Sequence, residues 1–378
     1  MTTLLHPESV DAHGTRRTSD LLPGYALVHA DLHNHTRLSD GRGDPREAFG
    51  SMRDAGLDAA AITDHTNLPN PFGSSMDDRG WRRLAELANS ANAAGEFVAI
   101  RGFEWSHPML GHINVWDSPD WTAPVWPTGR DLRRFYDWLE TPAAGDALTS
   151  FNHPGSRGTV LRFGDFVLRA PLRPRMVGLE MFNKTDDYLL ALDTNGVSPL
   201  VQCLDAGWRP GLIGVTDEHG RDWGKPEGKG RTGLYVNELS RAGIRDALAA
   251  RRSFACRVKG MRLVATLGGA LMGQRLPTLA ESSTELAVDL DLGPLAAGLE
   301  LSVQLLRWAS GVPAVEEVGR VSSGSGVLRT RVSVDPEEPW LVLRVTDPGG
   351  RPEFGSPQGY ADLGRSIAYT SPWWVGRG

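Results

Sequence analysis

Histidines and carboxylates recur along the first two thirds of the chain where short apolar runs end. The chain has ten histidines among its 378 residues, and six of them stand close to acidic residues in such positions. Imidazole nitrogens and carboxylate oxygens, without thiolates, are donors that suit Zn²⁺, Mn²⁺ or Fe²⁺. We therefore predict a metal centre whose ligands are His33, His35, Asp40, His65, Glu104, His112, His153, Asp217 and His219.

The first group of predicted ligands begins with a His-x-His pair. Alternate residues of a strand face the same side, so His33 and His35 project together and can bind one cation. Taken alone, the pair also suits a solvated strand end. Asp31 shares their face and is predicted to orient one imidazole. Asp40 follows in a loop, where a plain turn residue is the alternative.

The next segments deliver one ligand each. His65 ends a run of small and β-branched residues, and for the preceding Asp64 we favour a structural role. Glu104 ends an apolar strand, where an unpaired carboxylate is costly, so either an arginine or a metal must compensate it. A carboxylate there can bridge two cations. We favour His112 over the nearby His107 as the ligand that follows.

The last two segments repeat this pattern. His153 ends an apolar run and is followed at once by a Pro-Gly turn. Asp217 and His219 are again two residues apart at the end of a buried strand, and Glu218 between them is predicted to point away. The structural alternative requires six unrelated polar clusters at the same edge of the fold.

Alternating strands and helices position these residues. Strands are predicted over residues 26–35, 59–63, 97–104, 112–116, 147–152, 177–182, 212–216 and 233–236. Helices are predicted from the Asp44 cap and Pro45 onward, and over residues 81–94, 131–139, 198–206 and 242–250. This alternation favours an α/β domain with a mainly parallel sheet, closed or nearly closed into a barrel. In such a barrel, sites are assembled at one edge.

The pattern changes after residue 257. Apolar and polar residues alternate over residues 263–267, 285–292, 299–306, 327–334 and 340–345, which predicts an antiparallel sheet or sandwich. Trp373 and Trp374 are predicted to pack in a last edge strand. We thus expect a flexible leader (1–24), a metallohydrolase barrel (25–257) and a smaller antiparallel β domain (258–378).

Composition narrows the class of protein. The formal net charge is -6, so non-specific nucleic-acid binding is not expected. Cys203 and Cys256 cannot form a disulfide framework and are expected to be buried thiols in a reducing compartment. No apolar run has the length of a signal peptide or a membrane helix. We expect a cytoplasmic protein that acts on a small molecule, and its oligomeric state is left open.

As a set, these motifs resemble the PHP (polymerase and histidinol phosphatase) superfamily, in order over about residues 28–257. The finer pattern resembles the carbaryl-hydrolase-like branch, through the segments 102–105, 111–114 and 371–375. The resemblance implies a distorted, TIM-like (β/α)7 barrel with two or three divalent metals (Zn, Mn or Fe). It implies one metal at His33, His35, Glu104 and Asp217, a second at Glu104, His112 and His153, and a third at Asp40, His65 and His219. Many relatives have His in place of Asp40, which puts the third site in doubt.

The implied reaction is hydrolysis by a hydroxide that bridges the metals. Glu104 would be shared between metals, and Asp217 or His219 would handle the proton. A phosphoesterase (phosphatase or phosphodiesterase) is favoured, because most characterised relatives are phosphoesterases. The alternative is a carbamate, amide or ester hydrolase with the same centre, and a third hypothesis is a metal-dependent binding module.

Substrate-binding residues follow from these alternatives. A phosphate needs cationic partners, and loop cations that could supply them are Arg157, Lys184, Arg221 and Arg231. A carbamate would suit an aromatic pocket, which Trp105, Trp116 and Trp223 could line. Solvated loop charges and ordinary core packing are the respective structural alternatives.

Overall fold

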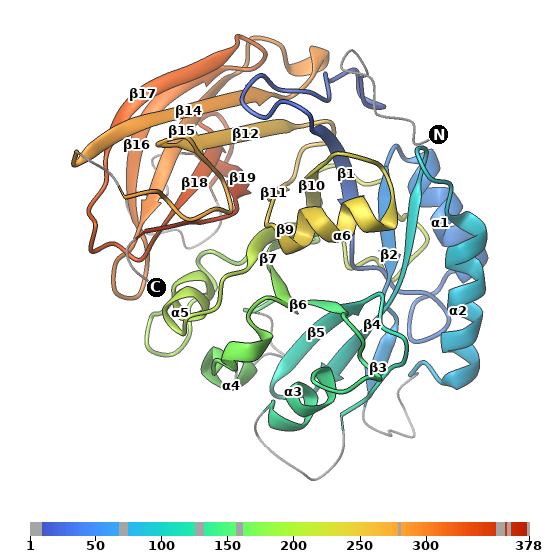
Figure 1. The fold of residues 1–378 in the computed structure, drawn as a ribbon. Coiled ribbons are helices and arrows are strands. Elements are labelled where there is room, and N and C mark those ends of the chain that lie inside the picture. Colours follow the sequence, from blue (N-terminus) through green and yellow to red (C-terminus); the bar gives the residue numbers. More distant parts are fainter. Residues whose placement is uncertain are drawn as a thin grey trace.

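The computed structural model describes residues 10–67, 75–124, 132–155, 162–278, 281–352, 360 and 364–375. Figure 1 shows a sheet from β1 to β11 with helices α1 and α2 along its outer side, beside a lobe formed by the C-terminal strands. The fold is mixed α/β, as the alternation of elements predicts. The predicted ligands all belong to the segment that forms the first of these two parts.

Two helices begin at aspartate N-caps. The Asp44 side chain accepts a hydrogen bond from the Arg46 N–H, Pro45 follows as the first helical residue, and α1 runs over Pro45–Asp54. In the same way Asp77 caps α2 (Asp78–Ala91), which therefore starts earlier than predicted. The remaining helices are α3 (Arg133–Leu139), α5 (Pro199–Asp205) and α6 (Arg241–Ala249), with a left-handed turn labelled α4 (Arg162–Phe166). No helix in the described ranges is long and apolar enough to cross a membrane.

The strands that carry the predicted ligands form most of the first sheet. Its members are β1 (Ala26–Asp31), β2 (Ala59–Ile62), β3 (His65–Asn67), β4 (Val98–His107), β5 (Gly111–Trp116), β6 (Leu148–Asn152), β7 (Met176–Asn183), β8 (Asp186–Asp187), β9 (Gly211–Val215), β10 (Arg231–Val236) and β11 (Ser253–Cys256). Each predicted strand is present, whereas β3, β8 and β11 were not predicted.

The strand directions are mixed, which corrects the expectation of a mainly parallel sheet. The pairs β1–β2, β2–β4, β3–β4, β6–β7 and β7–β9 are parallel. The pairs β4–β5, β5–β6, β1–β10 and β10–β11 are antiparallel. The physical reason at β4–β5 is the short connection through residues 108–110, because a tight hairpin can only join antiparallel strands.

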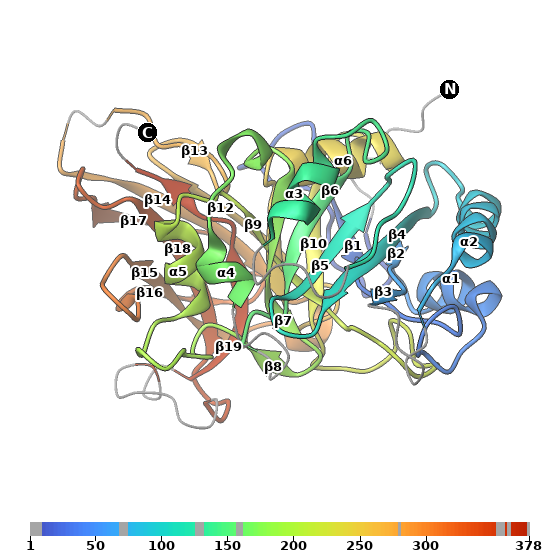
Figure 2. The same ribbon diagram turned by 90° about the horizontal axis from the view of Figure 1, so that it is seen from below.

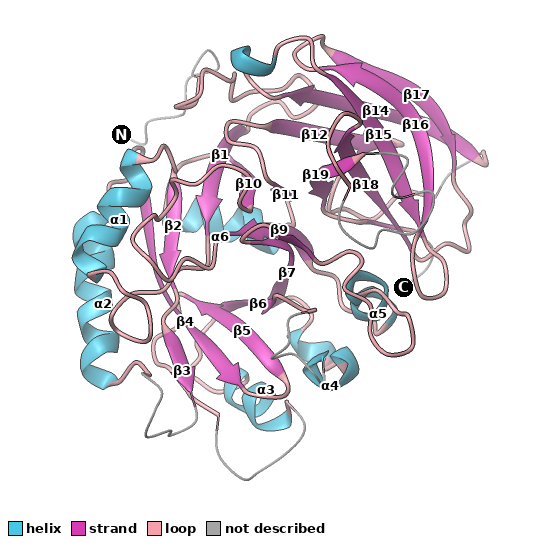
Figure 3. Ribbon diagram, turned by 180° about the vertical axis from the view of Figure 1, so that it is seen from behind, coloured by secondary structure: helices cyan, strands magenta, loops and turns pink. Residues whose placement is uncertain are grey.

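The backbone ladder of the described strands does not close into a barrel. In Figure 3 the strands curve around a common interior, with α1 and α2 outside, but β9 pairs only with β7. Across the seam, the Thr232 hydroxyl accepts from the Gly214 N–H and donates to the Gly214 carbonyl. The Thr232 hydroxyl thus forms hydrogen bonds with the Gly214 N–H and carbonyl, which would otherwise be available for backbone pairing between β9 and β10. A closed barrel is therefore not present among the described strands, and the distorted (β/α)7 barrel that the resemblance implies is not confirmed.

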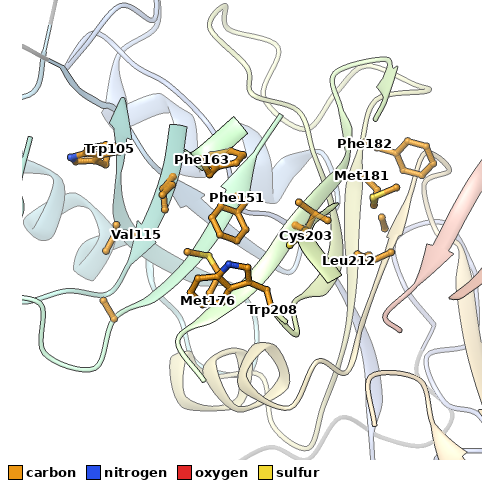
Figure 4. Close-up of a cluster of buried hydrophobic side chains, with 14 of the residues drawn as sticks. Trp105, Val115, Phe151, Phe163, Met176, Met181, Phe182, Cys203, Trp208 and Leu212 are labelled. Atoms are coloured by element: carbon orange, nitrogen blue, oxygen red, sulfur yellow. The ribbon is translucent and has the colours of Figure 1, made fainter. Parts of the chain in front are cut away.

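An aromatic cluster lies beside β6 and β7 (Figure 4). The ring centroids of Phe151 and Phe163 are 4.7 Å apart, and Trp208 lies 5.6 Å from Phe151. Trp208 donates its indole N–H to the Phe166 carbonyl, so this large ring is buried without an unpaired donor. Cys203 belongs to the same core and is a buried free thiol, as expected.

The C-terminal strands are antiparallel, as predicted, and Figure 2 shows them in two layers. One sheet contains β12 (Arg262–Leu267), β13 (Ala270–Leu271), β14 (Ser283–Asp291) and β17 (Val327–Ser333). The other contains β15 (Glu300–Arg307), β16 (Ala314–Ser322), β18 (Trp340–Asp347), β19 (Arg365–Thr370) and β20 (Trp373–Trp374). Because β19 pairs with β11, this second layer continues the first sheet. Trp373 and Trp374 are buried, as expected of packing residues.

The part of the predicted leader that the structure describes, residues 10–24, is anchored on the sheet. The Arg17 guanidinium binds both carboxylate oxygens of Asp58, at 2.8 and 2.9 Å. The buried Asp11 lies 3.3 Å from His29 of β1 and accepts two backbone N–H groups. Burial would raise the pKa of Asp11, but His29 and these N–H donors lower it to about 2.

Asp11→Asn should lower the free energy of unfolding by about 2 kcal/mol at pH 7, because a carboxylate with a lowered pKa stabilises the folded state while it is ionised. The amide keeps the shape and an acceptor oxygen. The difference should persist from pH 7 to about 5 and shrink below pH ~4, since the wild-type contribution is lost as pH falls toward 2. Urea unfolding across this range measures it, and equal stability at pH 7 would contradict the anchoring role of the charge.

Candidate metal centre

The ends of several strands converge on one cluster of histidines and acids. His33 and His35 follow β1, and His65 begins β3. The parallel register of β3 and β4 pairs His65 directly with Glu104. His112 lies on β5, antiparallel to β4. Asp40 lies in the loop between β1 and α1, His153 follows β6, and Asp217 and His219 follow β9. The structure brings together all nine residues that the sequence indicates.

Glu104 is the central side chain of this cluster. Its carboxylate is fully buried and lies within 3.5 Å of imidazole nitrogens of His33, His35, His65, His112 and His153. Burial would raise the pKa of Glu104, but the surrounding histidines hold it well below its usual range. In the described residues histidines, and no arginine, surround this charge, so the arginine alternative for Glu104 is not observed and the metal alternative stays a prediction.

The donor atoms form three overlapping groups, each with ligand atoms within 4.8 Å of one another. These groups are His33, His35 and Asp217; His65, Glu104 and His112; and His35, Asp40, His65 and His219. His153 joins the second group, since its Nε2 lies 3.3 Å from Glu104 Oε1. In the sets that the resemblance implies, His35 and His65 each belong to one set. In the structure each belongs to two groups, so neighbouring groups have a histidine in common.

The side chains at the centre of the cluster do not satisfy one another's hydrogen-bonding groups, whereas a bound cation would. The Nε2 atoms of His33 and His35 are only 3.0 Å apart in a fully buried site. Burial and the neighbouring His65 lower the pKa of His35 to about 3, so this imidazole is neutral and offers lone pairs. His35 Nδ1 is buried and has no hydrogen-bond partner among the described residues. A bound cation would satisfy such an orphaned acceptor.

Two buried aspartates hold the loops around the cluster. Asp31 accepts hydrogen bonds from the N–H and the hydroxyl of Thr216, at 3.1 and 2.5 Å. It therefore ties β1 to the end of β9, and this corrects the prediction that it orients an imidazole. Asp64 accepts from the Thr36 and Ser39 hydroxyls, each at 2.7 Å, which is the structural role favoured from the sequence.

Sequence reasoning missed Glu180, which lies in the middle of β7 and is fully buried. Its Oε1 is 2.8 Å from His33 Nδ1, and its Oε2 accepts from the His153 N–H at 2.7 Å. One signal could have found it. A carboxylate inside an otherwise apolar strand is costly unless a partner is present, as we argued for Glu104.

Three residues at the site have left-handed backbone conformations. The φ angles are 29° at His153, 46° at Asp217 and 52° at Lys184. Such conformations cost on the order of 1–3 kcal/mol for residues other than glycine and persist where the surrounding structure enforces them. Each follows the end of a strand, so each chain segment turns sharply as it delivers a side chain to the cluster.

One of the predicted substrate cations contacts a predicted ligand. Lys184 Nζ lies 3.0 Å from Asp217 Oδ2, with its side chain half exposed. Arg231 is buried and donates to the Gly224 carbonyl, so its role is structural. Arg221 is exposed and has no contact with the cluster in the part of the chain that is described. Arg157 lies outside the described residues.

The aromatic residues near the ligands are packing residues. Trp105 is 5% exposed, and its ring centroid lies 4.9 Å from that of Phe135, with the two rings tilted. Trp116 and Trp223 are buried and donate their indole N–H groups to the carbonyls of Leu32 and His35. Of the two alternatives for these side chains, core packing is the one observed.

The geometry also distinguishes His107 from His112 as the candidate ligand of this hairpin. His107 Nδ1 accepts hydrogen bonds from the backbone N–H groups of Met109 and Leu110, so it stabilises the hairpin loop. His112 Nδ1 instead lies 3.2 Å from Glu104 Oε1. Only His112 of this pair belongs to the cluster.

Comparisons with known proteins give weak likenesses. No family model and no curated protein matches the chain. Among solved structures, a two-domain protein containing a predicted PHP-like metal-dependent phosphoesterase from Bacteroides vulgatus is 18% identical, with 97% of this chain and 99% of that chain covered and a TM-score of 0.48. A protein described as a metal-dependent phosphoesterase from Bifidobacterium adolescentis is 15% identical over 58% of this chain and 95% of that chain, with a TM-score of 0.31.

An amidohydrolase from Chromobacterium violaceum, solved with sulfate and without metal, is also 15% identical, over 60% of this chain and 97% of that chain, with a TM-score of 0.31. All three TM-scores lie below 0.5, so these likenesses establish neither a family nor an activity for this chain. The metal-centre assignment depends on the donor geometry itself.

Glu104→Ala should remove more than one equivalent of bound Mn²⁺ or Zn²⁺, because this carboxylate lies within 3.5 Å of histidines that belong to all three groups of donors. His107→Ala is the matched control: it removes a histidine from the same hairpin and should keep the full metal content. Elemental analysis of the reconstituted, desalted proteins measures both. Equal metal content in the two variants would contradict the central place of Glu104.

Proposed function

We propose that this chain is a metal-dependent hydrolase that acts on a small phosphate ester. The observation that supports this proposal is the convergence of nine nitrogen and oxygen donors in a site that is buried at its base and open at its rim. The Glu104 and His33 side chains are fully buried, whereas those of Asp40 and His219 are 47% and 31% exposed. A substrate can therefore approach from the side of Asp40 and His219.

The three groups of donors described above are the residues that would hold the ions. When bound, divalent ions supply Lewis acidity and make a water nucleophile available near neutral pH. The buried carboxylates, Glu104 and Asp217, keep the charge of such a site balanced. Burial would raise the pKa of Asp217, but His33 and His35 hold it well below its usual range, so it stays ionised.

The rim supplies a candidate proton donor. His219 Nδ1 lies 2.9 Å from the Asp217 carbonyl oxygen, and its Nε2 lies 3.4 Å from Asp40. Burial would lower the pKa of His219, but Asp40 and Asp217 raise it. A protonated imidazole at the rim can protonate a leaving oxygen. Because Nε2 cannot donate a proton while it binds a cation, we assign this role to the form with two ions bound, around Asp217 and Glu104.

Lys184 favours a phosphate ester over a neutral carbonyl substrate. Its left-handed backbone is held by hydrogen bonds with Val215 and Gly230, so the ammonium is directed from a fixed point toward Asp217. Glycine would adopt that conformation at lower cost, and here a lysine occupies it. A fixed ammonium at the rim can bind non-bridging phosphate oxygens. The buried tryptophans provide no comparable support for an aryl carbamate.

The direct test is a hydrolysis panel on protein reconstituted with Mn²⁺ or Zn²⁺. It compares a nitrophenyl phosphate monoester and diester with a naphthyl carbamate and a nitrophenyl carboxylate ester, each beside His33→Ala. We expect metal-dependent release from a phosphate ester that the variant loses. Release only from the carbamate or carboxylate ester would transfer the chain to the carbonyl hydrolases. Retained metal with no turnover would favour a binding module.

Lys184→Met should lower kcat/KM for the phosphate ester by about 10-fold or more, since one charge-assisted hydrogen bond to substrate is lost. Lys184→Arg should retain part of the activity. Lys225→Met, at an exposed lysine, is the matched control and should leave kcat/KM unchanged. Metal content is measured in parallel because Lys184 contacts Asp217. Unchanged kcat/KM in Lys184→Met would remove the reason to prefer phosphate.

A further inference from the structure

Glu180 connects two predicted metal ligands that come from different strands. Its Oε1 lies 2.8 Å from Nδ1 of His33, which follows β1. Its Oε2 accepts from the backbone N–H of His153, which follows β6, and from the Asn183 side-chain amide at 2.9 Å. The carboxylate is fully buried. Both of its oxygens are therefore engaged, one with each ligand-bearing segment.

The contact with His33 decides which ring nitrogen faces the cluster. His33 Nε2 lies 3.2 Å from Glu104 Oε1 and 3.5 Å from Asp217 Oδ1, on the opposite side of the ring from Glu180. A carboxylate at Nδ1 can only accept, so the Nδ1–H donates to it. In the neutral form of the ring, which is the form that binds a cation, the lone pair is then on Nε2 and points at the donor cluster. Such a partner fixes the tautomer and orientation of a metal-binding histidine.

The contact with His153 fixes the backbone of the second ligand. His153 has a φ of 29°, which only strong local restraints maintain in a residue other than glycine. Its N–H donates to Glu180 Oε2 at 2.7 Å, a short charge-assisted hydrogen bond. This bond holds the turn that places His153 Nε2 at 3.3 Å from Glu104 Oε1.

We propose that Glu180 is the positioning residue of the metal centre: it sets the tautomer of His33 and, through its other oxygen, the left-handed turn at His153. The proposal depends on the proposed function, because it assumes that the cluster binds divalent ions. Glu180 lies behind the ligands and acts through them. Its removal should weaken metal binding while all nine proposed ligands remain.

The test measures Mn²⁺ and Zn²⁺ affinity of the metal-free full-length protein by competition with a chelating dye. Glu180→Ala should weaken binding by about 10- to 100-fold, the range typical of lost outer partners of metal ligands. Glu180→Gln should lose less, because its single carbonyl oxygen can serve one of the two ligand segments but not both. The matched control is Asp289→Asn, at another buried carboxylate that accepts from Ser19 and Arg262 in the C-terminal lobe. The Mn²⁺ and Zn²⁺ affinities of the Asp289→Asn variant should stay within twofold of wild type.

A second measurement needs no variant and covers the case in which Glu180→Ala does not fold. Nitrogen-15 spectra of the zinc-loaded wild type should show His33 with a proton on Nδ1 that exchanges slowly. The opposite tautomer would overturn the proposal. The proposal would also be overturned if Glu180→Ala bound metal as tightly as Asp289→Asn does. If only Glu180→Gln folds, that variant takes the place of Glu180→Ala in the comparison. If the wild type binds no metal, the proposed function fails; if it binds metal and the variant binds equally well, only the role of Glu180 fails.

Discussion

The burial of one carboxylate is the constraint on which this structure depends. Removing Glu104 from water without compensation would cost several kcal/mol, and no arginine approaches it in the described residues. The chain compensates it with five imidazoles from four different segments. The ends of β1, β3, β5 and β6 must therefore meet around β4. The donor set, the depth of the site and its capacity for cations all follow from this single requirement.

Other buried acids hold those segments in place. Asp31 ties the end of β1 to Thr216, and Asp64 closes the loop that contains Asp40. Glu180 reaches His33 and the turn at His153. Each of these carboxylates accepts at least two hydrogen bonds, so the side chains of the cluster project from fixed points. The hydrogen bonds also support left-handed turns that would otherwise be unfavourable at non-glycine residues.

Local patterns were sufficient to predict most strands of the first sheet and to select the nine side chains that the fold brings together, because a polar residue at the end of an apolar run is visible in the sequence. His33 and His35, or Asp217 and His219, are examples. Contacts between distant segments were not predictable in this way. The pairing of β19 with β11 and the hydroxyl seam at Thr232 depend on tertiary packing. Arg231 appears as a loop cation in the sequence, yet the fold buries it.

Anomalous diffraction from crystals grown with Mn²⁺ or Zn²⁺ tests the central claim most directly, because it locates ions without reference to activity. Two or three peaks are expected within coordination distance of the cluster, with Glu104 between at least two of them. The metal-centre assignment would be contradicted if, at saturating metal, the peaks lay only at surface sites and Glu104 contacted only histidines.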